Sequence, residues 1–218
     1  MSHCACGVWY VAGDDSEEAR HARLHSDNTT GPLLPALNDA QAIDSQNGLR
    51  IVRIGDRSDE RVRSAASQLA NTACQETSDV PPGYDGSITD GELVVFALLD
   101  GMRAVGFVLI GFSSASWPLR WIDETHAELV EESPNRSPRI VVGRVWIAAS
   151  YRRLGYGQGL MRAVASAHGV SVNDMAFETP LTDAGRALVH SVCGEYWYAK
   201  GDAFTMRDII VAVEPRSR

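Results

Sequence analysis

The sequence predicts an α/β fold in which a mixed, mostly antiparallel sheet is flanked by helices. Three patterns indicate this class. Residues 145–149 form an apolar run that ends at a glycine-containing turn and continues into a segment of helical periodicity. Residues 92–99 and 102–112 are apolar runs joined by Asp100-Gly101, a strong hairpin signal. Strand-like and helix-like segments alternate through the rest of residues 49–213, which is typical of a sheet covered by helices.

Length and charge limit the classes of protein that the chain can represent. Its 218 residues suffice for one ordinary domain with an appendage. The formal net charge of -8 argues against a general DNA-coating role and makes nucleic acid an unlikely direct substrate, because phosphate binding needs a positive face. The apolar runs are too short for a membrane span, and the N-terminus lacks the basic-then-apolar order of a signal peptide. We therefore expect a cytoplasmic protein without membrane contact.

Residues 1–27 predict a small zinc-binding module. Cys4 and Cys6 lie close together in a turn-like segment. His21 and His25 are four residues apart on a predicted helix, so that both imidazoles project from one face. Two thiolates and two imidazoles can make a tetrahedral Zn²⁺ site of the C2H2 type, and a module this small would obtain most of its folding free energy from the metal.

Two properties of this module leave alternatives open. A single residue separates Cys4 from Cys6, whereas zinc fingers usually place two to four there, and His3 could replace Cys4 as a ligand. A disordered tail that carries Cys and His is the other interpretation. The helix, predicted to be capped by Ser16, is acidic, which argues against reading of a DNA groove and favours a structural or docking module.

The remaining boundaries follow from composition and periodicity. Residues 28–48 are rich in Asn, Asp, Thr, Gly and Pro and predict a linker, whereas residues 214–218 form a short tail. Between them we expect the main domain. Its predicted elements are a strand at 49–54, a helix from a Ser58 cap to about Cys74, the hairpin at 92–112, a central strand at 139–149, a helix at 158–168, a strand at 174–179, a Thr182-capped helix at 183–193 that ends at Gly194, and two paired strands at 195–200 and 204–213. In residues 117–136, Trp121 and Ile122 could extend the sheet, and 128–136 predicts a surface loop.

The turn after the central strand predicts an anion-binding site. Glycines allow close approach of a ligand to the backbone, and the helix that follows contributes free amides and the positive end of its dipole. Two arginines add charge for further phosphates. An ordinary strand-to-helix turn with surface arginines is the alternative. The candidate cofactor contacts are Ile147, Ala148, Ala149, Arg152, Arg153, Leu154, Gly155, Tyr156, Gly157 and Gln158.

The pattern Arg-x-x-Gly-x-Gly at Arg152, Gly155 and Gly157 resembles the coenzyme A pyrophosphate loop of the GNAT superfamily of N-acetyltransferases. The predicted order of elements matches the GNAT order as well. Further segments resemble the zinc-finger-containing sister-chromatid cohesion acetyltransferases: Cys-x-Cys-Gly-Val-x-Tyr with His-x-x-x-His, Arg144-Val145-Trp146-Ile147, Ala176-Phe-Glu-Thr-Pro180, and Cys193-Gly194. The resemblance implies acetyl-CoA as co-substrate, a structural Zn²⁺, and direct acetyl transfer to a deprotonated amine, most readily a protein lysine.

The resemblance also implies catalytic positions. The family places an acidic base where Thr179 stands, and the neighbouring Glu178 is the candidate base; the alternative is a solvated carboxylate at a strand end. His190 stands where many GNAT enzymes have a tyrosine that protonates the leaving thiolate, although a half-buried helix histidine is the simpler interpretation. Backbone amides around Ile147 to Ala149 would stabilise the oxyanion. Two other functions stay open: a GNAT enzyme acting on a small amine, and a non-catalytic adaptor that binds coenzyme A and docks a partner through its finger.

Overall fold

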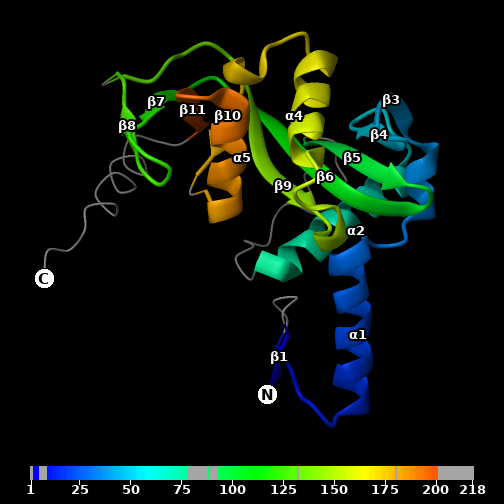
Figure 1. Ribbon diagram of the computed structural model, residues 1–218. Coiled ribbons are helices and arrows are strands. Elements are labelled where there is room, and N and C mark those ends of the chain that lie inside the picture. Colours follow the sequence, from blue (N-terminus) through cyan, green and yellow to red (C-terminus); the bar gives the residue numbers. More distant parts are fainter. Residues whose placement is uncertain are drawn as a thin grey trace, which may run out of the picture. The chain divides into compact units, whose positions relative to one another are not determined.

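A computed structural model describes residues 2–4, 9–77, 88, 93–131, 133–179 and 181–200 (Figure 1). The chain divides into two compact units. The first comprises residues 1–109 and 145–163, and the second comprises residues 110–144 and 164–218. The boundaries between the units fall within strands β6 (Arg103–Ser113) and β9 (Arg139–Ile147) and helix α4 (Tyr156–Ala167).

The sheet of the first unit has the strand order β3-β4-β5-β6-β9. It begins with β3 (Gln41–Gln46), β4 (Leu49–Ile54) and β5 (Val94–Asp100), which pair antiparallel in sequence. Six of the seven residues of β5 are buried, as its continuous apolar run requires. The core between this sheet and its helices contains Ile51, Ile54, Phe96, Leu98 and Phe107.

Two hairpin turns set the register of this sheet. Gly101 and Met102 join β5 to β6, so the predicted hairpin is present with its turn one residue later than expected, and Gly101 adopts a positive φ of 57°. Asn47 and Gly48 join β3 to β4 with φ angles of 51° and 81°. Positive φ at both central residues defines a type I′ turn, whose twist matches that of the flanking strands. This second turn directly follows Gln46, which pairs with Leu49.

The helices of the first unit differ from the expected ones mainly at their N-termini. Helix α1 (Asp15–Thr30) is longer than predicted, and its N-cap is Asp14 rather than Ser16, because the Asp14 carboxylate accepts hydrogen bonds from the amides of residues 16 and 17. Helix α2 (Glu60–Thr77) has its predicted buried face, including Val62, Ala66 and Leu69. The Ser58 hydroxyl accepts from the Gly55 amide, outside the helix, so the predicted Ser58 cap is wrong.

Residues 28–48, expected to be a linker, contain regular structure. They hold the end of α1, the 3-10 helix η1 (Pro35–Asp39) and strand β3. Strand β3 is polar and mostly exposed, and it lies at one edge of the sheet, where only β4 pairs with it. An edge strand of this kind needs no apolar alternation, which explains why the composition of the segment suggested a linker.

The sheet of the second unit has the strand order β9-β10-β11-β7-β8. Strand β10 (Ala176–Glu178) is parallel to both β9 and β11 (Tyr196–Lys200), while β7 (Trp117–Trp121) pairs antiparallel with β11 and β8 (Ala127–Leu129). The 3-10 helix η3 (Val172–Asp174) precedes β10, and α5 (Asp183–Cys193) follows it. Within the described residues, β11 has β10 on one side and β7 on the other, whereas its predicted partner at 204–213 lies outside them. Residues 204–218 themselves, including the predicted tail, lie outside the described part of the chain.

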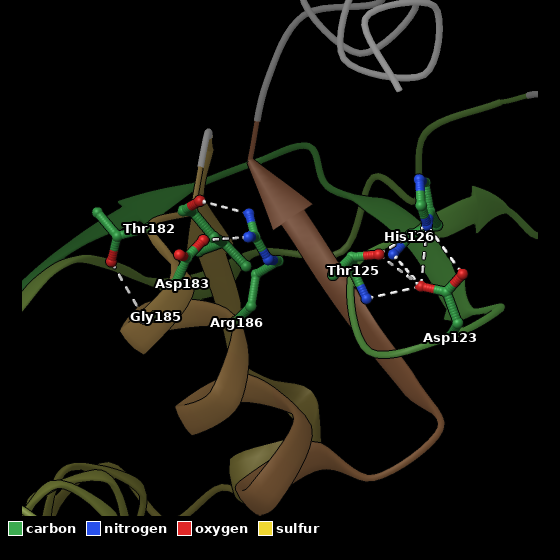
Figure 2. A network of polar contacts seen from close by, with 8 residues as sticks. Asp123, Thr125, His126, Thr182, Asp183, Gly185 and Arg186 are labelled. Atoms are coloured by element: carbon green, nitrogen blue, oxygen red, sulfur yellow. Dashed lines mark hydrogen bonds and ion pairs between the residues drawn. The ribbon is translucent and has the colours of Figure 1, made fainter. Parts of the chain in front are cut away.

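Side chains close two turns of the second unit (Figure 2). Thr182 Oγ1 accepts from the Gly185 amide at 3.1 Å, which confirms the predicted cap of α5, and Arg186 pairs with Asp183 in the first turn. Gly194 ends the helix at a φ of 69°, also as predicted. In the loop between β7 and β8, the Asp123 carboxylate accepts from the amides of residues 125 and 126. These hydrogen bonds, with others from Thr125 and His126, hold the pKa of Asp123 well below its usual range.

A two-stranded ribbon precedes α1: β1 (Ser2–His3) pairs antiparallel with β2 (Trp9–Tyr10). Among the described residues, no helix combines the length and apolar character that crossing a membrane would require.

Candidate functional site

The candidate cofactor loop begins where β9 leaves the sheet. The Ala148 amide donates a hydrogen bond of 2.9 Å to Val105 O on β6. The chain then turns through the 3-10 helix η2 (Ala149–Tyr151), in which the Tyr151 amide donates to Ala148 O at 2.8 Å. Of the three residues predicted to supply oxyanion donors, Ala148 therefore has its N–H occupied by the sheet.

The predicted glycine loop contains two residues with positive φ. Gly155 adopts a φ of 81°, and Arg153 adopts a φ of 62°, which is uncommon for a residue with a side chain. Helix α4 starts at Tyr156, and its first backbone hydrogen bond runs from the Gly159 amide to Gly155 O at 3.0 Å. The amides of residues 156–158 precede this bond, so they are the donors that a helix leaves for a ligand at its N-terminus.

The side chains of the loop face outward. Arg152, Arg153, Leu154 and Gly155 are all exposed, whereas Leu160 and Met161 of the following helix are fully buried. The Arg152 Nε donates to Ile147 O at 2.8 Å, which fixes the base of that guanidinium against the end of β9. The loop thus combines an exposed backbone, two arginines and a helix N-terminus that is anchored by its apolar face, which is the arrangement that phosphate binding requires.

Tyr151 connects this loop to the β5–β6 hairpin. Its hydroxyl donates a hydrogen bond of 2.6 Å to Asp100 Oδ2. The hydrogen bond to Asp100, reinforced by partial burial and by the negative charge of the carboxylate, raises the pKa of Tyr151 to about 12. The sequence predicted Asp100 only as a turn residue and indicated no role for Tyr151.

Gln46 also contacts the loop and was missed from the sequence. Its Nε2 donates to Gly155 O at 3.3 Å, across 109 residues of sequence. Its amide group lies against Gly159 of α4. The Asn47-Gly48 pair that follows Gln46 is a strong hairpin signal, and it would have identified the strand that presents this side chain.

The candidate catalytic residues Glu178 and His190 both lie in the second unit. Glu178 Oε1 forms an ion pair of 3.1 Å with Lys200 Nζ, and the two side chains are 33% and 45% exposed. The neighbouring Thr179 hydroxyl donates to Lys200 O at 3.4 Å. His190 is exposed on α5, with its ring centroid 6.0 Å from that of Trp121. Each candidate side chain is at least partly exposed to solvent.

Three of the four predicted zinc ligands lie together in the first unit. Ligand atoms of Cys4, His21 and His25 all fall within 4.8 Å of one another. Cys4 Sγ is 3.4 Å from His25 Nδ1, and tetrahedral Zn²⁺ with bonds of about 2.3 Å to sulfur and 2.0 Å to nitrogen would hold the two atoms about 3.5 Å apart. The Tyr10 ring stacks on His21 with centroids 4.0 Å apart, which orients that imidazole. Cys6 and the His3 side chain lie outside the described residues.

Comparison with known proteins identifies the fold. No family model and no curated protein matches the chain. Among solved structures, the xEco2 acetyltransferase domain bound to a CoA conjugate is 15% identical, with a TM-score of 0.61 over 75% of this chain and 99% of that chain. A second structure of the xEco2 acetyltransferase domain is 14% identical, with a TM-score of 0.61 over 75% of this chain and 97% of that chain. The chain therefore shares the α/β fold of the xEco2 acetyltransferase domain, a mixed sheet flanked by helices, as the sequence predicted.

Proposed function

We propose that this chain is an acetyl-CoA-dependent N-acetyltransferase that binds its cofactor at the junction between β9 and α4. The observation that carries the proposal is the junction itself. A sheet strand leads through η2 into a turn with positive φ at Arg153 and Gly155, and this turn presents the first amides of α4 on an exposed surface. Such a turn favours a pyrophosphate through hydrogen bonds, helix dipole and arginine charge together.

The reaction transfers acetyl directly from the thioester to an amine. The neutral amine attacks the thioester carbonyl, a C–N bond forms, the C–S bond breaks, and the thiolate takes up a proton. A base is needed because a lysine amine with a pKa of about 10.4 is almost fully protonated at neutral pH. Glu178 is the proposed base and His190 the proposed acid. Backbone amides near Ile147 and Ala149 are the proposed oxyanion donors, since the Ala148 amide donates to Val105 O.

A protein lysine is the proposed acceptor. Support comes from the sequence similarity of the finger and of the C-terminal half to the cohesion acetyltransferases. The net charge of -8 also favours a cationic acceptor, because the field of an acidic protein attracts cations. A small cationic amine would be attracted in the same way, so only the measured transfer of acetyl groups to each acceptor class distinguishes the two.

Cofactor binding is tested by calorimetric titration of acetyl-CoA into the wild type and an Arg152→Ala, Gly155→Glu double variant. The double variant removes one cation and adds a carboxylate at an exposed turn position, and we expect at least about tenfold weaker binding. Arg162→Ala is the matched control, because Arg162 is exposed on α4 beyond the loop. Equal affinity in the double variant and the wild type would contradict the assignment of the loop.

Acceptor class is tested with radiolabelled acetyl-CoA and two acceptor pools, host-cell proteins and a panel of polyamines and aminoglycosides. We expect labelled protein with the wild type and with Arg162→Ala, and none with the double variant. Label confined to small amines would make the chain a small-molecule acetyltransferase. Cofactor binding without transfer to either pool would instead indicate an adaptor.

The proposed function includes a structural Zn²⁺ at the N-terminus, held by Cys4, Cys6, His21 and His25. The convergence of three of these side chains supports the assignment. The metal would join the segment before α1 to the exposed first half of that helix, which has few apolar residues to pack. We expect about one zinc per chain by mass spectrometry of the purified protein. Cys4→Ser and His21→Asn should lower the zinc content, and His126→Asn, which changes a partly exposed histidine of the second unit, should not.

A further inference from the structure

Gln46 occupies a fixed position at the end of an edge strand. It is the last residue of β3 and pairs with Leu49 across the Asn47-Gly48 turn. Both turn residues have positive φ, so the two-residue connection is a tight type I′ hairpin. The backbone of Gln46 is therefore held by β4, which is itself largely buried.

The Gln46 side chain ends in the first turn of α4. Its Nε2 donates to Gly155 O at 3.3 Å. The same carbonyl accepts the first helical hydrogen bond, from the Gly159 amide at 3.0 Å. Gln46 Oε1 is buried and has no hydrogen-bond partner among the described residues. The hydrogen bond from Nε2 to Gly155 O is therefore the contact that orients this amide group.

The glycine at position 159 provides the space for this amide. A Cβ built at Gly159 would overlap the Gln46 side chain, with Nε2 only 2.6 Å away. Glycine inside a helix lowers helix stability relative to alanine. The presence of glycine here is explained by the need to accommodate Gln46.

We propose that Gln46 is a positioning residue of the cofactor loop: it holds the Gly155 carbonyl and thereby sets the direction of the amides of residues 156–158. The proposal rests on the proposed function, since those amides are the proposed pyrophosphate donors. Gly155 needs such a restraint, because a glycine at a φ of 81° has no side chain to limit rotation of the adjoining peptide groups. The Gln46 amide supplies it from a separate, sheet-bound segment.

Affinity for CoA tests the proposal in the full chain. We expect Gln46→Ala to weaken CoA binding about three- to tenfold, because the loop amides lose their fixed direction. At low salt, Gln46→Glu should weaken CoA binding more than Gln46→Ala does, since a carboxylate cannot donate to Gly155 O and repels the pyrophosphate. This additional loss of affinity should become smaller at high salt, which screens the repulsion. Gln41→Ala is the matched control: Gln41 is the same residue type on the same strand and is exposed. Equal affinities of Gln46→Ala and Gln41→Ala would overturn the proposal.

A double-mutant cycle with Gly159→Ala separates positioning from helix stability. Gly159→Ala should favour the helix and yet weaken CoA binding, because its methyl group displaces the Gln46 amide. In a Gln46→Ala background the space is vacant, so the same substitution should have no further effect on affinity. If Gly159→Ala lowers CoA affinity equally in the wild-type and Gln46→Ala backgrounds, the methyl group clashes directly with the cofactor, and the proposal is contradicted.

Hydrogen exchange of the ligand-free protein distinguishes failure of this proposal from failure of the proposed function. We expect the amides of residues 155–160 to exchange about threefold faster or more in Gln46→Ala than in the wild type or in Gln41→Ala. If the wild type does not bind CoA but this difference is seen, the positioning contact stands and the proposed function fails. If the wild type binds CoA and neither exchange nor affinity changes in Gln46→Ala, the positioning role fails alone.

Discussion

The Tyr151 hydroxyl and the Asp100 carboxylate are joined by a hydrogen bond of 2.6 Å, which ties the turn before the cofactor loop to the tip of the β5–β6 hairpin. The same hairpin carries Arg103, whose Nη1 donates to Gly31 O at the end of α1 at 2.7 Å. The first unit thus uses the hairpin as a common support for the turn η2 and for the helix that bears His21 and His25.

Tyr151→Phe is the first test of this support. The variant loses one hydrogen bond to a carboxylate at a largely solvated site, so we expect the free energy of unfolding to fall by about 0.5–1 kcal/mol. The pKa of Tyr151 is raised to about 12, and the contact therefore stabilises the fold below pH 10 and is lost as the pH rises through 12. Spectrophotometric titration should show a late tyrosine ionisation near pH 12 that is absent from the variant. A titration curve with no late step in the wild type would contradict the contact.

Arg153→Gly separates backbone strain from charge in the cofactor loop. Arg153 has a φ of 62°, and a glycine relieves the steric cost of that conformation. Because glycine also gains entropy in the unfolded chain, the net change in the free energy of unfolding should lie between about 0 and 1 kcal/mol in favour of the variant. CoA affinity should nevertheless fall about three- to tenfold, since a phosphate-binding cation is lost. Arg153→Lys keeps both the charge and the strain, so affinity preserved in Arg153→Lys and lost in Arg153→Gly would assign the effect to charge.

Gly31→Ala tests how α1 meets the hairpin. Gly31 has a φ of 85°, and a Cβ there would lie 2.9 Å from the carbonyl carbon of Ala104. We expect a loss of more than about 2 kcal/mol of unfolding free energy from the positive φ and the backbone clash combined. Gly13→Ala is the matched control: Gly13 has a φ of 86° with no atom within 4 Å of its Cβ position. Equal losses of unfolding free energy in Gly31→Ala and Gly13→Ala, measured by thermal or urea unfolding, would mean that the contact with Ala104 does not contribute.

The elements with strong local signals were predictable from the sequence. Asp100-Gly101 located the β5–β6 hairpin, and the Thr182 cap with Gly194 defined α5 to the residue. These signals act within a few residues, where backbone conformation and short hydrogen bonds decide the structure. The glycine loop was predictable for the same reason.

The misassigned parts depend on contacts between distant segments. Strand β3 has a polar, exposed sequence, and its strand conformation follows from pairing with β4 at the edge of the sheet. The role of Gln46 depends on Gly155, 109 residues away, which no local pattern encodes. The pairing of β11 with β10 on one side and β7 on the other is a property of the strand order, which the sequence of β11 does not encode.

The proposed base can be tested by removing the Glu178 carboxylate. Glu178→Gln should lower kcat for acetyl transfer about 10²-fold or more near pH 7. The deficit should shrink as the pH rises, because a lysine acceptor with a pKa of about 10.4 then deprotonates without a base. Measurement of kcat against pH from 6 to 10 for the two proteins checks this. Activity equal to that of the wild type at every pH would exclude Glu178 as the base.

Thr179→Asp in the Glu178→Gln background completes the test. The resemblance to cohesion acetyltransferases implies that their acidic residue corresponds to position 179, directly after the end of β10 at Glu178. A carboxylate moved to position 179 leaves the ion pair that Glu178 forms with Lys200. Recovery of activity would show that a carboxylate at position 179 can act as the base. No recovery, together with lower activity in Glu178→Gln alone, would assign the base to position 178. Lys200→Gln, which removes the ion pair with Glu178, should then retain activity.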